Sequence, residues 1–393
     1  MKNYIFGTGN FAIESAKRLQ KFGIKIDAFI NVRDINKNVP NCLLNNIPVF
    51  MTDEKINIDI DSRFFLAKKP MFMGNAIDYL RKNNYKNIYI INEMMFFKKQ
   101  NSIDELFEYI DKIDLDKPFL NYLEINLVDQ CNLNCKGCAH FSNICNNHMV
   151  SIEQFENDLK KITDIFNLYS FRLLGGEPLL HPNLKEIIEI SRKYLNDSML
   201  TIVTNGLLID KLNDDILKAI SENNVIISIS LYKPTYKKLS IINEILKKYN
   251  IKYLLNDDIF RKTEPINKFH TRLSTTKQYE NNQPYERCSG RFCRFLNDGK
   301  IAKCYYPLLI HYLNEKYNFN FQINEGDYIY LKDIDNGWDA IDEMNKPIPF
   351  CGYCREYLDE FNWESNHKND KDGNSYVLKQ SYNLHNYIEE DKK

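Results

Sequence analysis

Short apolar runs and longer amphipathic segments alternate along the first part of the chain. The runs predict strands, and the amphipathic segments, in which apolar residues recur every three or four positions, predict helices. In chain order these segments are strand 3–9, helix 10–22, strand 24–31, strand 64–67, helix 76–84 and strand 87–92. Strands that alternate with helices favour a parallel sheet. We therefore predict a small parallel α/β domain over residues 1–118.

The same alternation continues over residues 119–285. The predicted strands lie at 122–128, 170–174, 200–204, 225–231 and 252–256. Residues 151–166 carry apolar positions at helical spacing, and Ser151 with Gln154 matches a capping box at the start of that helix. Repeated βα units close into a full or partial barrel, whose chemistry lies at the carboxyl ends of its strands. The expected fold class is α/β, with a central partial (βα)6 barrel.

The rest of the chain is less regular. Residues 286–360 contain five cysteines and form the third predicted region, and residues 361–393 read as a polar tail. With 393 residues, 44% of them hydrophobic, the chain has room for several cores. The formal net charge of -1 gives no reason to expect nucleic acid as a partner.

The cysteine content indicates the compartment and the chemistry. The first residues lack the apolar core of a signal peptide, and no apolar run is long enough to cross a bilayer. We therefore expect a cytoplasmic protein without a membrane span. Ten cysteines in a reducing compartment indicate metal ligands rather than a disulfide framework.

A loop with four cysteines follows the first strand of the central region. Cys131, Cys135 and Cys138 have the spacing C-x3-C-x2-C, and Cys145 stands apart. A structural zinc site requires four ligands, and an iron–sulfur cube has four irons, usually with four thiolates. Three close thiols leave one metal corner open, as a catalytic site requires.

The next strand ends carry polar residues and glycines. Gly175, Gly176 and Glu177 follow the second strand, Asn205 ends the third, and Ser228 lies at the end of the fourth. Glycines let the backbone approach a ligand closely, and exposed carbonyls and a carboxylate can accept hydrogen bonds from an ammonium group. Polar residues at successive strand ends are typical of a barrel active site.

The cysteine loop followed by Gly-Gly-Glu-Pro at residues 175–178 resembles the radical SAM superfamily. The resemblance covers the second region. It implies that Cys131, Cys135 and Cys138 hold a [4Fe–4S] cluster whose fourth iron is occupied by S-adenosylmethionine. Gly175, Gly176 and Glu177 would then receive the methionine ammonium, and Asn205 and Ser228 would contact the ribose or the carboxylate.

The same resemblance implies the reaction. An electron from the cluster cleaves S-adenosylmethionine to methionine and a 5′-deoxyadenosyl radical, which abstracts hydrogen from a substrate. The family usually places an aromatic residue before the third cysteine, near adenine, but this chain has Gly137 there. Adenine would then be held by backbone or by another side chain such as Phe141. Cys145 reads as a packed loop cysteine, a hydrogen-atom donor of the kind an epimerase requires, or a labile extra ligand.

The third region resembles the auxiliary-cluster extensions called twitch or SPASM. Cys288 and Cys304 flank Gly299, which fits a hairpin turn, and Cys351 and Cys354 form a Cys-x2-Cys pair. No cysteine follows Cys354, so one auxiliary [4Fe–4S] cluster is expected. Cys293 makes five thiols for four positions and competes with Cys288. A structural zinc site with the same ligands is the alternative.

The first strand–helix turn is G-x-G-x-x-A, with Gly7, Gly9 and Ala12. Such a turn lets a helix N-terminus meet a diphosphate, but Asn31 stands where an NAD-binding site has an acidic residue. The stretch resembles the Rossmann-like domain found ahead of some sugar-modifying enzymes of surface-polysaccharide pathways. Dinucleotide binding, docking of a nucleotide-sugar or a partner, and a purely structural role all stay open.

These expectations lead to a functional hypothesis. The chain is predicted to be a radical SAM enzyme that acts on a small-molecule, saccharide or nucleotide-sugar substrate by dehydrogenation, dehydration or epimerisation. An electron donor such as flavodoxin or ferredoxin would supply the reducing electron. The alternatives are a SPASM-type peptide maturase and a non-catalytic metal-binding scaffold with a nucleotide-sensing domain.

Overall fold

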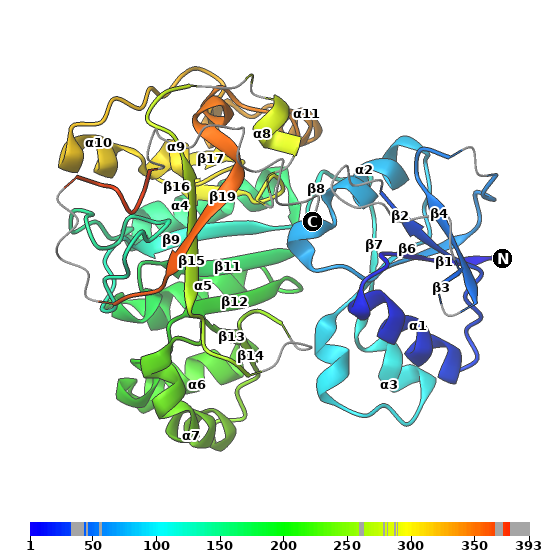
Figure 1. The fold of residues 1–393 in the computed structure, drawn as a ribbon. Coiled ribbons are helices and arrows are strands. Elements are labelled where there is room, and N and C mark those ends of the chain that lie inside the picture. The colour runs from blue at the N-terminus through cyan, green and yellow to red at the C-terminus, as the bar shows by residue number, and fades with distance from the viewer. Residues whose placement is uncertain are drawn as a thin grey trace, which may run out of the picture.

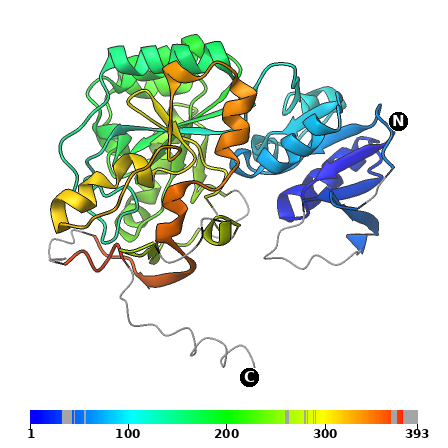
Figure 2. The ribbon, with the colours of Figure 1, turned by 90° about the horizontal axis from the view of Figure 1, so that it is seen from above.

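The structure is a computed structural model that describes residues 1–32, 43–44, 46–54, 57–258, 263–277, 280, 282–286, 288, 290–365 and 372–377. Cys42 and residues 366–371 and 378–393 lie outside the described residues. The described chain forms two lobes, an N-terminal domain and a larger core (Figure 1). Figure 2 shows the same two lobes from above.

The N-terminal domain is a sheet covered by helices on both faces. Its strand order is β3-β4-β2-β1-β5-β6-β7, and β4, β2, β1, β5 and β6 run parallel. The strands are β1 Asn3–Phe6, β2 Ala28–Asn31, β3 Leu43–Leu44, β4 Ile47–Met51, β5 Arg63–Leu66, β6 Ile88–Ile91 and β7 Ile110–Ile113. Helices α1 (Asn10–Lys21) and α3 (Ile103–Phe107) pack on one face, and α2 (Gly74–Lys82) packs on the other. The predicted parallel α/β architecture is confirmed.

The core sheet has five parallel strands from the second region. They are β9 Leu123–Val128, β11 Ser170–Gly175, β12 Met199–Thr204, β13 Ile226–Ile229 and β14 Tyr253–Leu255. The helices between them are α4 Ile152–Ile165, α5 Leu184–Tyr194, α6 Asp214–Glu222 and α7 Lys233–Lys248. One face of the sheet buries its apolar residues against these helices. The expected α/β class is confirmed, but the described strands form an open sheet rather than a closed barrel.

The cysteine-rich region completes this sheet. Strand β16 (Phe295–Asn297) pairs in parallel with β9, and β17 (Lys300–Ala302) and β18 (Ile329–Tyr330) follow antiparallel. Asp298 and Gly299 have φ angles of 45° and 73° in the turn between β16 and β17. Both angles suit a tight hairpin, so the predicted Gly299 turn is confirmed. The remaining helices are α8 Asn282–Glu286, α9 Tyr306–Leu309, α10 His311–Tyr317 and α11 Gly337–Met344.

Two segments far apart in the sequence form a ribbon over the core. Strand β15 (Lys268–Leu273) pairs antiparallel with β19 (Cys354–Asn362), and the pair crosses the front of the core in Figure 1. Part of the predicted polar tail, residues 361–393, packs on the core within the described residues, since its first two residues end β19. Trp363, Tyr376 and Val377 are buried against the core, because their apolar side chains find partners there.

Smaller elements complete the chain. Short strands β8 (Phe119–Leu120) and β10 (Asn167–Leu168) pair with each other. The 3-10 helices are η1 Pro70–Phe72, η2 Glu93–Phe97, η3 Pro178–Leu180, η4 Ile209–Lys211, η5 Leu331–Asp333 and η6 Pro349–Tyr353. Within the described ranges, no helix is long and apolar enough to cross a membrane.

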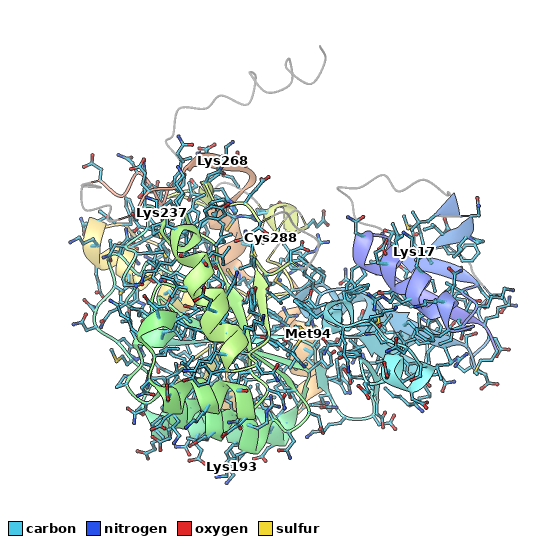
Figure 3. The ribbon with its side chains drawn as sticks, turned by 90° about the horizontal axis from the view of Figure 1, so that it is seen from below. Lys17, Met94, Lys193, Lys237, Lys268 and Cys288 are labelled. Carbon is cyan, nitrogen blue, oxygen red and sulfur yellow. The ribbon has the colours of Figure 1, made fainter. Side chains whose placement is uncertain are left out.

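The two lobes share polar and apolar contacts. Met94, labelled in Figure 3, packs against Ile226 and Leu254 of the core. Arg81 lies 2.6 Å from the Asp342 carboxylate, on α11. The N-terminal domain is therefore docked on the core through several side chains.

Candidate active site

Two residues separate the end of β9 from Cys131, so the cysteine loop lies at the carboxyl edge of the core sheet. Cys131, Cys135 and Cys138 pack in one small cluster with Leu133 and Trp363. All three are free thiols. Burial raises the pKa of Cys131 and of Cys135 to about 12. Metal binding requires thiolates and releases their protons. These two thiols would therefore lose their protons when a metal binds.

The cysteine loop offers three thiol donors in one cluster. A structural zinc site takes four protein ligands, whereas a four-iron cube held by three thiolates keeps one iron open. The donor set of the loop therefore fits a [4Fe–4S] cluster with one iron left for another ligand.

Gly175 and Gly176 hold the ends of β9 and β11 together. A Cβ at Gly175, where φ is +153°, would lie 2.2 Å from the carbonyl oxygen of Val128. A Cβ at Gly176 would lie 2.1 Å from the carbonyl oxygen of Gln130, and the Gly176 N–H donates to the Val128 carbonyl at 2.7 Å. The glycines allow two backbones to meet just before Cys131, and contact with S-adenosylmethionine stays a prediction.

Glu177 lies beneath the loop as a fully buried carboxylate. It accepts hydrogen bonds from the Thr204 hydroxyl at 2.6 Å, the Asn205 N–H at 2.9 Å and the Leu179 N–H at 3.1 Å. Burial raises the pKa of Glu177 to about 7, and these three donors oppose that rise. The carboxylate joins the ends of β11 and β12, and its predicted contact with an ammonium group stays a prediction.

Asn205 and Ser228 have different surroundings. The Asn205 side-chain amide donates to Asn132 at 2.7 Å and lies 3.7 Å from the sulfur of Cys131, so it belongs to the cysteine loop. The Ser228 hydroxyl instead donates to Asp257 at 3.1 Å. The structure brings Asn205, but not Ser228, against the loop.

Gly137 and Phe141, the two loop positions considered above in connection with adenine, are both covered by other residues of the chain. Gly137 has φ +59°, and a Cβ there would lie 2.5 Å from the Phe361 ring. The ring of Phe361, on β19, therefore packs directly against the loop at Gly137. Phe141 is 1% exposed and packs inside the core, so it presents no open ring face.

Cys145 packs in a different apolar cluster from the other three thiols of the loop, although Cys138 and Cys131 are close enough to raise its pKa. Its thiol donates to the Ser142 carbonyl at 3.5 Å. Burial, and then the neighbouring Asp129 carboxylate, raises the pKa of Cys145 to about 12. Asp129 itself accepts from the Tyr312 hydroxyl at 2.6 Å. Cys145 is therefore a protonated thiol near the cysteine loop.

The third region brings its five thiols near one another. Burial, and then Cys304 and Cys288, raises the pKa of Cys354, and Cys288 also raises the pKa of Cys304 and of Cys351. The sulfur of Cys293 lies 3.3 Å from that of Met71 in the N-terminal domain. Burial raises the pKa of Cys293, and Cys304 and Cys288 also raise it. All five thiols therefore lie in one neighbourhood, and the choice between Cys288 and Cys293 as a ligand of the auxiliary cluster stays a prediction.

An aromatic pair that the sequence did not indicate connects the two cysteine regions. His140, two residues after Cys138, stacks on Tyr305, the neighbour of Cys304, with ring centroids 4.7 Å apart. Asn126 of β9 lies 3.1 Å from the His140 ring nitrogen Nδ1. A histidine inside a cysteine loop was the available signal for this contact.

The sheet face opposite the helices carries a partly buried charged network that was also missed. Arg172 donates to Asp257 at 2.8 Å and lies 3.9 Å from Glu124. Burial alone would raise the pKa of Asp257, but the Arg172 guanidinium holds it below its ordinary value. Arg172 interrupts the apolar run of its strand, which could have indicated a polar interior.

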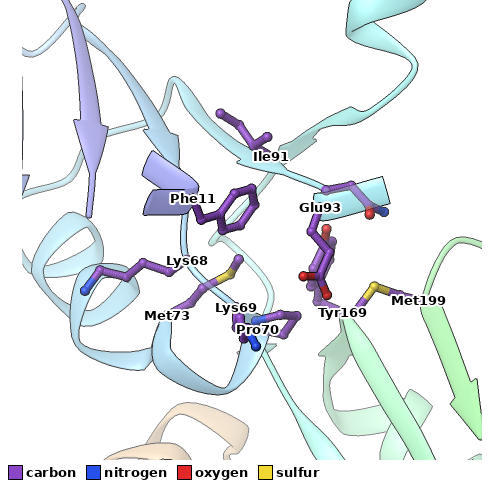
Figure 4. A pocket seen from close by; sticks show the side chains of 10 residues that line it. Phe11, Lys68, Lys69, Pro70, Met73, Ile91, Glu93, Tyr169 and Met199 are labelled. Atoms are coloured by element: carbon purple, nitrogen blue, oxygen red, sulfur yellow. The ribbon is translucent and has the colours of Figure 1, made fainter. Parts of the chain in front are cut away.

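The N-terminal glycine turn lies near a small cavity between the lobes (Figure 4). Phe11, Lys68 and Glu93 line the cavity from the N-terminal domain, and Tyr169 and Met199 line it from the core. A Cβ at Gly7 would lie 2.8 Å from the Ala67 carbonyl, so this glycine serves the packing of β1 on β5. Gly9 has no atom within 4 Å of such a Cβ. Binding of a diphosphate by Gly7 and Gly9 stays a prediction.

Comparison with known families agrees with this geometry. Residues 125–256, from β9 to the end of β14, match the model of the Radical SAM superfamily. This chain contains a radical SAM domain. The cofactors of that superfamily are a [4Fe–4S] cluster and S-adenosylmethionine, and the loop with Cys131, Cys135 and Cys138 fits the cluster.

Curated relatives match a part of the chain. The GTP 3′,8-cyclase of Trichodesmium erythraeum (strain IMS101) is 34% identical over 104 residues, which are 25% of this chain and 32% of the relative. The GTP 3′,8-cyclase of Clostridium perfringens (strain 13 / Type A) is 29% identical over 148 residues, 36% of this chain and 44% of the relative. The matches therefore cover less than half of either relative.

Two solved structures give weak overall similarity. BtrN in complex with AdoMet and 2-DOIA is 14% identical with a TM-score of 0.36, over 62% of this chain and 100% of that one. Native anSMEcpe with bound AdoMet and the Cp18Cys peptide is 24% identical with a TM-score of 0.29, over 34% of this chain and 41% of that one. At these TM-scores neither structure carries an argument about this chain.

Proposed function

We propose that this protein is a radical SAM enzyme that cleaves S-adenosylmethionine reductively and abstracts hydrogen from a saccharide or nucleotide-sugar. The observation that carries this proposal is the joining of three strand ends around Cys131, Cys135 and Cys138. Main-chain bonds from Gly176 and Glu177 hold the segment before Cys131. When bound, the cluster and S-adenosylmethionine supply a 5′-deoxyadenosyl radical.

The residues of this chain would bind and orient the reactants. Asn205 lies against Cys131 and is held by Glu177, so it is positioned to contact the methionyl or ribose part of S-adenosylmethionine. The loop itself is partly covered by β19, which supports exclusion of water from a reactive intermediate. An electron donor such as flavodoxin or ferredoxin would deliver the reducing electron.

The polar face of the core sheet supports a hydroxyl-rich substrate. Arg172, Asp257 and Ser228 form a connected hydrogen-bonding set there. Such groups can exchange their mutual bonds for bonds to sugar hydroxyls, and burial makes each bond selective because an unpaired polar group is costly. The N-terminal domain, a parallel sheet with helices on both faces, is a further feature expected of an enzyme that docks a nucleotide-sugar.

Cys145 and the auxiliary thiols bear on the outcome of the reaction. A protonated Cys145 could return a hydrogen atom to a substrate radical, which would make the reaction an epimerisation and leave a Cys145 thiyl radical. The external electron donor, with a proton from solvent, would then restore the thiol. An auxiliary [4Fe–4S] cluster on Cys304, Cys351, Cys354 and either Cys288 or Cys293 could instead accept an electron from the substrate radical, which would make the reaction a dehydrogenation. Replacing Cys145 by alanine separates the two, since only the epimerisation requires its thiol hydrogen.

The test is reductive cleavage with candidate substrates. Protein purified without oxygen is mixed with dithionite, S-adenosylmethionine and a panel of uridine, guanosine and cytidine diphosphate sugars deuterated on the sugar carbons. We expect 5′-deoxyadenosine, with deuterium transferred from at least one sugar. Production of 5′-deoxyadenosine without deuterium from any sugar would contradict the substrate class, and no 5′-deoxyadenosine at all would contradict the enzymatic proposal.

A further inference from the structure

Glu364, in the segment after β19, contacts the cysteine loop through both its main-chain carbonyl and its side-chain carboxylate. The Lys136 N–H donates to the Glu364 carbonyl at 3.0 Å, and the Lys136 ammonium lies 3.3 Å from the Glu364 carboxylate. Lys136 stands between Cys135 and Cys138. The position of Trp363, the neighbour of Glu364, is therefore set by main-chain and side-chain bonds to the loop.

Close packing beside these bonds leaves the segment little freedom. A Cβ at Gly137 would lie 2.5 Å from the Phe361 ring and 2.6 Å from the Ser375 carbonyl oxygen. Only a glycine allows the loop to approach the two segments this closely. The contact between the C-terminal segment and the loop is therefore specific in shape as well as in hydrogen bonding.

Trp363 itself reaches a thiol. Its indole N–H donates to the sulfur of Cys135 at 3.2 Å. The two residues are 8% and 7% exposed. The indole ring stacks on Tyr232, with centroids 4.9 Å apart and planes 21° apart. A buried indole N–H needs an acceptor, and the Cys135 sulfur is the acceptor for Trp363.

We propose that Trp363 tunes the radical SAM cluster by donating a hydrogen bond to the thiolate of Cys135, and thereby raises the reduction potential of the cluster. The inference rests on the proposed function, because it requires Cys135 to be a cluster ligand. An N–H dipole aimed at a cluster sulfur stabilises the reduced, more negative state, and hydrogen bonds to the sulfurs are one of the factors that set cluster potentials. Trp363 is thus a positioning residue that acts through Cys135.

The chain provides a matched control. It has two tryptophans, and the other one, Trp338, lies on α11 with Arg81 stacked 4.3 Å from its ring. Trp363→Phe removes the N–H and keeps an aromatic ring against Tyr232, whereas Trp338→Phe makes the same change at the junction of the lobes. The midpoint potential is measured by redox titration followed by EPR, on the signal that changes when S-adenosylmethionine is added.

We expect the midpoint potential of Trp363→Phe to be more negative than that of wild type, with unchanged iron content. Trp338→Phe should keep the wild-type potential. Equal potentials in all three proteins would overturn the inference while leaving the cluster assignment intact. A wild type without a signal that responds to S-adenosylmethionine would overturn the proposed function and this inference together.

A second measurement covers the case in which Trp363→Phe loses its cluster. Tryptophan labelled with ¹⁵N in the indole ring, incorporated into Trp338→Phe protein, labels Trp363 alone. Pulsed EPR of the reduced cluster should then detect hyperfine coupling to that nitrogen. Absence of the coupling in protein with full iron content would overturn the inference.

Discussion

The carboxyl edges of the two parallel sheets differ, although both carry glycines directly after a strand. At the edge of the core sheet, Gly176 and Glu177 bind the backbone before Cys131, and Glu177 binds the end of β12. At the edge of the N-terminal sheet, Gly7 packs against Ala67, and Gly9 approaches nothing. Tyr169 and Met199 of the core line the cavity beside that turn.

The difference shows what a glycine at a strand end can and cannot indicate. In the core, the glycines bring three strand ends into hydrogen-bonding contact, and the thiols of the next loop are gathered as a result. In the N-terminal domain the same residue type relieves a local clash between two strands. Function follows from the polar groups that converge at an edge, and the glycine alone is insufficient evidence.

The largest expected effect is on the iron content of the protein. Wild-type protein purified without oxygen should carry about eight irons, as two four-iron clusters require. Replacing Cys131, Cys135 and Cys138 together by alanine should leave about four, measured by colorimetric iron analysis. If the triple variant kept its full iron content, the core edge would not be the cluster site and the comparison would fail.

The two glycine edges should also differ in stability. Gly176→Ser places a Cβ 2.1 Å from the Gln130 carbonyl, so the backbone before Cys131 must shift. We expect a loss of about 1–3 kcal/mol in the free energy of unfolding, together with reduced iron content. Gly9→Ser, with open space and a serine at the start of α1, should stay within about 0.5 kcal/mol of wild type. Urea denaturation measures both, and equal losses would contradict the comparison.

The buried carboxylate at the core edge predicts a dependence on pH. The pKa of Glu177 is raised by burial to about 7, above the value of about 4.3 in an unfolded chain. Between these two values the folded protein binds the proton that the unfolded chain has released, so stability falls as pH rises through this window. Comparison of wild type with Glu177→Gln from pH 4.5 to 8 should show this fall in wild type only. Parallel pH curves would contradict the assignment.

The smallest expected effect is on nucleotide binding at the carboxyl edge of the N-terminal sheet. If Gly9 admits a diphosphate, wild type should bind uridine, guanosine or cytidine diphosphate by calorimetry, and Gly9→Val should lose that binding while its thermal midpoint is unchanged. The valine side chain would occupy the open space at the start of α1. Failure of wild type to bind any of these, or NAD, would make the domain structural or partner-docking and would weaken the nucleotide-sugar proposal.

Much of the fold could be predicted because its pattern is local. The alternation of strands and helices predicted both sheets, and the helix after Ser151 begins where expected, with the Ser151 hydroxyl accepting from the Gln154 N–H at 3.1 Å. The reciprocal bond of a capping box is missing, since the Gln154 side chain binds Asp158 at 2.8 Å. The joining of β16 to β9 was not predicted, because pairing between distant strands leaves no periodic signal in either one.

The spacing of the cysteines along the chain predicted that the three thiols of the loop lie together. It did not predict which distant residues contact them. The three thiols of one loop lie together because five intervening residues cannot separate them widely. The roles of Trp363 and Phe361 could not be predicted, since they approach the loop from more than 200 positions away by chain folding alone. Ser228 was assigned by its place at a strand end, but its hydroxyl faces Asp257, which arrives from the turn after β14.

The most direct test of the central claim is the EPR spectrum of reduced, oxygen-free protein before and after addition of S-adenosylmethionine. The account predicts a [4Fe–4S] signal whose g-values shift when S-adenosylmethionine binds the iron that the loop leaves open, and loss of that shift in the triple variant of Cys131, Cys135 and Cys138. A spectrum that S-adenosylmethionine leaves unchanged in fully iron-loaded wild type would contradict the account.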